Sequence, residues 1–165
     1  MRTTRLAHLA ALSLLVAQGA ALAADTPSPP PSPPPPSAAP AATDPLAGAR
    51  SRIAAKQWGA AIDDLKKVNA TGNADWNNLM GFSMRKQATP DLEGSQRYYD
   101  AALRIDPLHK GTLEYSGELA LMKKDLPTAE ARLATLQRAC PAGCPELDEL
   151  KRSIAQYKAG DPRPY

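Results

Sequence analysis

The segments LEGSQRYYDAALRIDP (92–107) and LPTAEARLATLQRACP (126–141) decide the fold, because the second repeats the pattern of the first 34 residues later. The matched positions are Leu92 and Leu126, Ser95 and Ala129, Tyr99 and Leu133, Ala102 and Leu136, and Pro107 and Pro141. A fixed period of this size is typical of stacked repeats, which bury their apolar faces against one another. The chain is therefore expected to be an array of helical units.

The same register extends toward the N-terminus. The corresponding positions 34 residues earlier are Trp58, Ala61, Leu65 and Val68. Apolar residues at intervals of three and four predict a first helix that begins at Pro45, with Thr43 or Asp44 as its cap. Six further helices are expected at 58–68, 75–86, 92–105, 110–123, 126–139 and 146–158. Thr89 or Asp91 can cap the helix at 92–105.

Over residues 44–141 the chain resembles the tetratricopeptide repeat (TPR) family. The residues that carry the resemblance are Gly81, Ser95, Tyr99, Ala102 and Pro107 in one unit, and Gly117, Ala129, Leu133, Leu136 and Pro141 in the next. The segments NLMGF (78–82) and DPLH (106–109) are also similar to this family, whereas Arg52 departs from its pattern in the first unit. The resemblance implies an all-α, right-handed solenoid of three helical hairpins, closed by a C-terminal capping helix within residues 44–158.

Glycine at the eighth place of each unit has a packing role in this interpretation. Gly81 and Gly117 lie in the middle of the helices expected at 75–86 and 110–123. A residue without a side chain lets a neighbouring helix approach closely. We expect each glycine to face the second helix of its own hairpin.

The N-terminus has the features of an export signal. Arg2 and Arg5 precede a short apolar run, and small residues follow up to Ala24. A basic end, an apolar segment and an Ala-x-Ala site predict a secretory signal peptide at 1–24, too short to be a stable membrane span. An uncleaved anchor is the alternative. The mature protein is expected in the periplasm or outside the cell, without a membrane span.

Residues 25–43 contain nine prolines. Proline fixes φ and lacks a backbone donor, so this segment is expected to be an extended, disordered tether. It could also be a ligand for a proline-binding groove, although a spacer is the simpler interpretation. Residues 159–165 are expected to form a flexible tail.

Charge and side-chain chemistry exclude several classes of function. Without Arg2 and Arg5, the chain keeps 18 basic and 17 acidic residues, so no nucleic-acid-binding surface is expected. We find no phosphate-binding loop, no metal-ligand cluster, no cofactor motif and no catalytic triad. His109 is expected to be a solvated turn residue. The sequence therefore predicts a protein that is not an enzyme.

The two cysteines, Cys140 and Cys144, flank Pro-Ala-Gly between the last repeat and the capping helix. In an oxidising compartment, a structural disulfide is the leading interpretation. Pro141 ends one helix, Gly143 can take positive φ and Pro145 begins the next helix, so the chain must reverse here. A redox-active or metal-handling pair remains an alternative.

Proteins of the resembled family commonly hold peptides or partner helices in a concave groove, lined by the first helix of each unit. The corresponding residues here are Asn78, Phe82, Arg85, Glu114, Glu118 and Leu121, which share a face at helical spacing. We therefore expect an exported scaffold that binds a peptide or protein partner. Alternatively, these positions are only a solvated surface. The other hypotheses are an accessory redox or metal-handling protein using the two cysteines, and a structural subunit that assembles through its repeat ends.

Overall fold

The computed structural model describes residues 44–160. The expected signal peptide (1–24) and tether (25–43) lie outside the described residues, as does most of the expected tail. The described residues belong to one compact unit. Between residues 44 and 160, no helix is both long and apolar enough to cross a membrane.

Seven α-helices and no strand occur in the described part of the chain, which confirms the expected all-α class. The helices are α1 (Ala47–Ala54), α2 (Trp58–Val68), α3 (Ala74–Arg85), α4 (Leu92–Ile105), α5 (Lys110–Met122), α6 (Leu126–Ala139) and α7 (Pro145–Lys158). The bounds of α2, α4 and α6 are those predicted. The bounds of α3, α5 and α7 differ from the prediction by one residue at one or both ends.

Polar side chains cap four of these helices. Asn73, Asp91, His109 and Asp125 each accept a hydrogen bond from the backbone N–H three residues later, at 2.7–3.1 Å. Each bond satisfies one of the N–H groups that the first turn of a helix leaves without a partner. Of the two candidate caps for α4, Asp91 rather than Thr89 is used.

The expected start of the first helix is wrong. The Asp44 side chain accepts from the backbone N–H of Leu46 at 2.9 Å, and the Ala47 N–H donates to the Asp44 carbonyl at 3.1 Å. These bonds fold residues 44–47 into a turn, so α1 begins at Ala47 instead of Pro45. The turn also buries Leu46, which is only 3% exposed.

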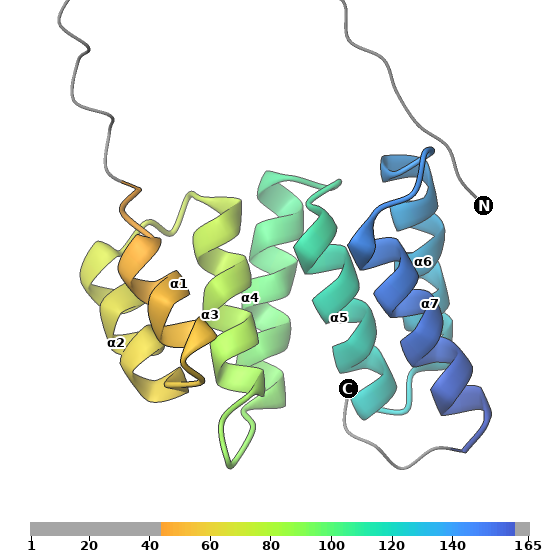
Figure 1. The fold of residues 1–165 in the computed structure, drawn as a ribbon, viewed down its shortest axis with the longest axis horizontal. Helices are drawn as coiled ribbons and strands as arrows, with labels where there is room; N and C mark the ends of the chain where they lie inside the picture. Colours follow the sequence, from red (N-terminus) through yellow and green to blue (C-terminus); the bar gives the residue numbers. More distant parts are fainter. Residues whose placement is uncertain (1–43, 161–165) are drawn as a thin grey trace, which may run out of the picture. The chain divides into compact units, whose positions relative to one another are not determined.

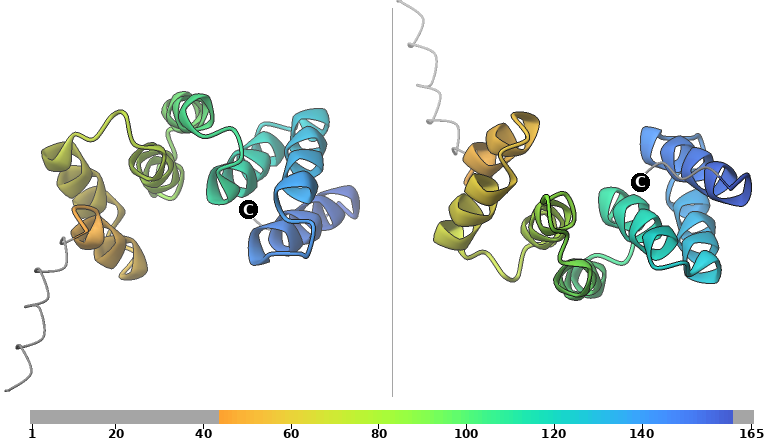
Figure 2. Two further views of the ribbon diagram at one scale, coloured as in Figure 1. Left: turned by 90° about the horizontal axis from the view of Figure 1, so that it is seen from above. Right: turned by 90° about the horizontal axis from the view of Figure 1, so that it is seen from below.

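The helices pack as consecutive pairs joined by short turns (Figure 1). The pairs are α1 with α2, α3 with α4 and α5 with α6, and α7 packs against both α5 and α6. The first helices also contact one another in series, α1 with α3, α3 with α5 and α5 with α7. These four helices form one row, and the views from above and below show α4 and α6 on the other side (Figure 2).

The apolar core is divided into two clusters. One joins α1, α2 and α3 around Leu65, Trp76 and Met80. The other joins α5, α6 and α7 around Leu113 and Leu150. The indole N–H of Trp76 donates to the Leu65 carbonyl at 2.7 Å. The one polar group of this large buried side chain therefore has a hydrogen-bond partner.

The residues that match the repeat pattern lie at packing positions. Tyr99, Ala102 and Ala129 are fully buried, and Leu133 is half-buried. Pro107 and Pro141 are exposed and follow the ends of α4 and α6, where a residue without a backbone donor stops the helix.

The two helical glycines allow close approach, but to different neighbours. A Cβ at Gly81 would lie 2.7 Å from Tyr99 Cε1 on α4, within the same hairpin, as expected. A Cβ at Gly117 would lie 2.7 Å from Leu150 Cδ1, which belongs to α7. The expectation that Gly117 faces its own hairpin partner, α6, is therefore wrong. Gly117 instead makes room for α7.

Gly117→Leu is expected to lower the free energy of unfolding by about 1–3 kcal/mol, because the new side chain would overlap the buried Leu150. Gly59→Leu is the matched control, since a Cβ at Gly59 meets nothing within 4 Å and leucine favours the helix. Urea denaturation of both variants checks the prediction. Equal midpoints for the two variants would contradict the packing of α7 on Gly117.

Candidate functional site

Two adjoining open pockets lie along the row of first helices. The smaller, about 550 Å³, extends from α1 across α3 to the first turns of α5. The larger, about 740 Å³, extends from α5 to residues 142–145 and the first turns of α7. Glu114, Tyr115 and Glu146 line both pockets. We call the two pockets together the groove.

The six residues expected in the groove fall into two groups. Asn78, Phe82 and Glu114 line it. Arg85, Glu118 and Leu121 do not line it and are buried, with exposed fractions of 2%, 7% and 1%. The second group lies further along α3 and α5, where these two helices pack directly on each other.

Arg85 and Glu118 form a buried ion pair between α3 and α5. Arg85 Nη2 lies 2.6 Å from Glu118 Oε2, and the two side chains are 0% and 9% exposed. Ser153 on α7 donates to the other carboxylate oxygen of Glu118 at 3.3 Å. The guanidinium carbon of Arg85 is 5.7 Å from the ring centroids of both Phe82 and Tyr115. The pair therefore lies beneath the aromatic part of the groove lining.

Glu114 is the carboxylate at the centre of the groove. It is 8% exposed and has no hydrogen-bond or ion-pair partner among residues 44–160. Burial, together with the negative charges of Glu118, Glu146 and Glu149 and against the opposing effect of Arg85, raises the pKa of Glu114 from 4.5 to about 8. Around Glu114, burial and negative charge thus outweigh the positive charges of Arg85 and Lys86.

Tyr115, which sequence reasoning did not select, is the aromatic residue of this centre. Its ring packs on Phe82 with centroids 4.5 Å apart, and Phe82 also makes an edge contact with Trp58 at 5.8 Å. Burial raises the pKa of Tyr115 to about 12, and Glu114 and Glu118 contribute to the rise. No signal in the sequence distinguishes Tyr115, because it lies beside the helix face on which the groove residues were sought.

Asn78 has an unsatisfied group at the wall between α3 and α5. The residue is 6% exposed, and its Oδ1 is buried without a hydrogen-bond partner. The side chain lies against Gly111 on α5, where a Cβ would be 3.3 Å from Asn78 Nδ2. A buried acceptor without a donor is unfavourable by about 1–3 kcal/mol, so such a group is usually explained by a partner.

His109 is not the solvated turn residue expected from the sequence. Its Nδ1 accepts from the Thr112 N–H at 3.1 Å, and its Nε2 lies 2.9 Å from Asp75 Oδ1 on α3. In the neutral imidazole the proton is therefore on Nε2, which donates to the carboxylate. Asp75 also accepts from Arg50 at 3.0 Å, so α1, α3 and α5 are joined at this end of the groove. The signal in the sequence was the position of His109 directly before a helix, three residues before Thr112.

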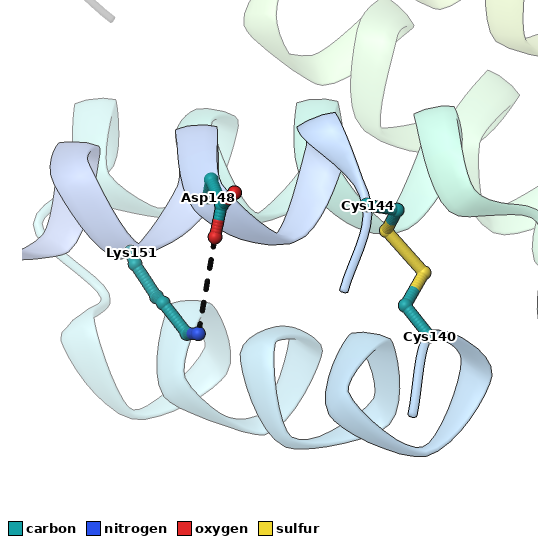
Figure 3. The surroundings of a disulfide bond; sticks show 4 residues. All are labelled: Cys140, Cys144, Asp148 and Lys151. Atoms are coloured by element: carbon teal, nitrogen blue, oxygen red, sulfur yellow. Dashed lines mark ion pairs between the residues drawn. A yellow bond between two sulfur atoms is a disulfide. The ribbon is translucent and has the colours of Figure 1, made fainter. Parts of the chain in front are cut away.

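Cys140 and Cys144 form a disulfide, with their Cα atoms 5.8 Å apart. Figure 3 shows the bond joining the end of α6 to the start of α7, one turn before the ion pair of Asp148 and Lys151. Gly143 takes a φ of 89° in the turn, as the expected chain reversal requires. Cys140 is buried in the second apolar cluster, whereas Cys144 lines the larger pocket.

No group of three potential ligands is placed to hold a metal ion within residues 44–160. Comparison with known proteins adds no assignment, because no family model, curated protein or solved structure matches the chain. The groove and the disulfide are therefore interpreted from their own chemistry.

Arg85→Met and Glu118→Met are each expected to lower the free energy of unfolding by about 3–5 kcal/mol, because each leaves a buried charge without its partner. The double variant is expected to be more stable than either single variant, since neither charge of the pair then remains buried without the other. The control is Arg152→Met, which breaks the exposed pair with Glu149 and should change stability by less than about 1 kcal/mol. Additive effects of the two buried substitutions in a double-mutant cycle would contradict the coupling.

Glu114→Gln is expected to become increasingly stabilising, relative to wild type, as the pH rises from 4.5 to about 8. Over this range the unfolded chain releases the Glu114 proton while the folded chain retains it, so the wild type loses stability with rising pH. The expected change in the difference between the two proteins is about 1–3 kcal/mol. Denaturation at a series of pH values measures it, and a pH-independent difference would show that Glu114 titrates normally.

Proposed function

We propose that the chain is an exported, non-catalytic scaffold of the TPR type, which binds a peptide or protein partner in the groove. The observation that carries the proposal is the position of the groove. It follows the first helix of each hairpin, α1, α3 and α5, and continues onto α7. This is the surface on which the resembled family binds its ligands.

The repeat pattern and the helix pairing support the TPR-type arrangement independently of the groove. The two quoted segments, 92–107 and 126–141, contain α4 and α6, the second helices of successive hairpins. Equivalent positions in the two segments are buried, as Ser95 and Ala129 illustrate. Repeats that pack in this way expose one continuous surface along their first helices.

Export to an oxidising compartment is part of the proposal. The disulfide is compatible with it, because such bonds persist mainly outside the cytosol. The basic and apolar N-terminus supports it from the sequence.

The experiment uses two exposed apolar residues as a matched pair. Leu108, which is 53% exposed, lines the groove, whereas Ile105, which is 45% exposed, does not. The mature protein is used to capture partners from the exported fraction of the source cells. We expect Leu108→Asp to lose partners that wild type and Ile105→Asp both retain. Equal capture by all three proteins would show that the groove is not the binding surface.

The redox alternative is separated in the same experiment. A scaffold should keep its partner when Cys140 and Cys144 are both replaced by serine, provided that circular dichroism shows the variant is folded. A redox protein should instead lose its activity. Partners bound only through a mixed disulfide with Cys144 would favour the redox interpretation.

A further inference from the structure

The groove lining has an excess of negative charge. Its carboxylates are Asp75, Asp106, Glu114, Glu146, Asp148 and Glu149. Three permanently basic side chains also line it, and two of these are already paired, Arg50 with Asp75 and Arg152 with Glu149. Lys110 is exposed at the start of α5. The negative charge is local, because the whole chain has a formal charge of +3.

The central carboxylates lack the partners that the outer ones have. Glu114 and Glu146 make no ion pair within the described residues, and both line the two pockets. Glu118, buried below them, is occupied by Arg85. A cation that reached Glu114 and Glu146 would therefore not compete with an existing ion pair.

Asn78 provides an independent indication of a ligand. Its Oδ1 is a buried acceptor without a donor, and the side chain lines the groove next to Gly111, one turn before Glu114. A hydrogen-bond donor from a ligand would satisfy Asn78 Oδ1, whereas the Asn78 amide nitrogen and the Tyr115 hydroxyl can themselves donate.

Tyr115 is the aromatic residue at the centre of the groove. Its half-buried ring lines both pockets beside Glu114. Carboxylates next to an aromatic ring are well suited to a guanidinium or ammonium group, which interacts with both. The geometry within the protein already shows this mode, since Arg85 pairs with Glu118 and lies 5.7 Å from the Tyr115 ring centroid.

We propose that the partner presents a basic polypeptide segment, and that one of its arginine or lysine side chains enters the groove between Glu114, Glu146 and Tyr115, with Asn78 accepting a further hydrogen bond from the segment. This inference rests on the proposed function, because it assumes that the groove is where the partner binds. It specifies the sign of the partner's charge, which the proposed function leaves open. A segment rich in cations is bound, and a segment rich in carboxylates is repelled.

The ionisation of Glu114 supports the proposal. Its pKa of about 8 means that a bound cation would favour loss of the proton near neutral pH. The charged groups that face it are Glu118 on its own helix, Glu146 and Glu149 on α7, Arg85 on α3, and Lys86 directly after α3. Affinity for a cationic segment is therefore expected to increase as the pH is raised toward 8, and proton release should accompany binding.

The test measures binding of two labelled peptides to the mature protein by fluorescence anisotropy. One is a short peptide of alternating arginine and glycine, and the other has glutamate in place of arginine. We expect only the arginine peptide to bind, and its affinity should fall with added salt. Glu114→Gln and Glu146→Gln are each expected to weaken binding about tenfold, the effect of losing one charge-assisted contact.

Asp63→Asn is the matched control. Asp63 is an exposed carboxylate on α2 that does not line the groove. Its substitution removes a negative charge outside the groove, as Glu146→Gln removes one inside it, so it should leave affinity for the arginine peptide unchanged. An equal loss of affinity in all three variants would show non-specific attraction and would overturn the proposal.

The outcomes separate this inference from the proposed function. If the glutamate peptide binds, and Leu108→Asp abolishes its binding, then the groove is a binding site but the inferred charge of its partner is wrong. If neither peptide binds, and no captured partner depends on Leu108, then both the inference and the proposed function are wrong. If the arginine peptide binds wild type and Glu114→Gln equally, the inference alone is overturned.

Discussion

The ion pair of Arg85 and Glu118 is the contact on which the rest of the structure depends. The two apolar clusters lie on opposite sides of it, one at α1–α3 and the other at α5–α7. Its charges are buried, so their geometry is far more restrictive than that of an apolar contact, which tolerates small shifts in register. The pair therefore aligns α3 with α5, and it does so directly beneath the aromatic residues of the groove.

This arrangement explains why the groove is polar at its centre. Arg85 neutralises Glu118 within the protein, but the next carboxylate along α5, Glu114, has no such cation. Arg85 is fully buried against Glu118, whereas Lys86, which attracts both glutamates, is only half-buried. The unmatched carboxylate is on the side of α5 that the groove makes accessible.

Helix positions could be predicted from the sequence, whereas the depth of individual side chains could not. The start of α4 is set by the hydrogen bond from Gly94 to Asp91, and its end by the proline that follows it. Both signals depend only on residues that are neighbours in the sequence. Helical spacing also placed Asn78 and Arg85 on one face correctly. Which of them is covered depends on how closely α3 approaches α5, and that distance is set by contacts between hairpins. The pairing of His109 with Asp75 was missed for the same reason, since it joins residues that are 34 apart in the chain.

The disulfide has a consequence for the order in which the molecule matures. Residues 142–145 lie within the loop closed by Cys140 and Cys144, and they also form part of the wall of the larger pocket. In a newly made, still reduced chain, this wall is held by the packing of α7 alone. Oxidation converts it into a covalently fixed edge, so the wall of the pocket is fully constrained only after the two thiols have been oxidised. The reduced and the oxidised protein therefore differ in how this part of the pocket wall is held.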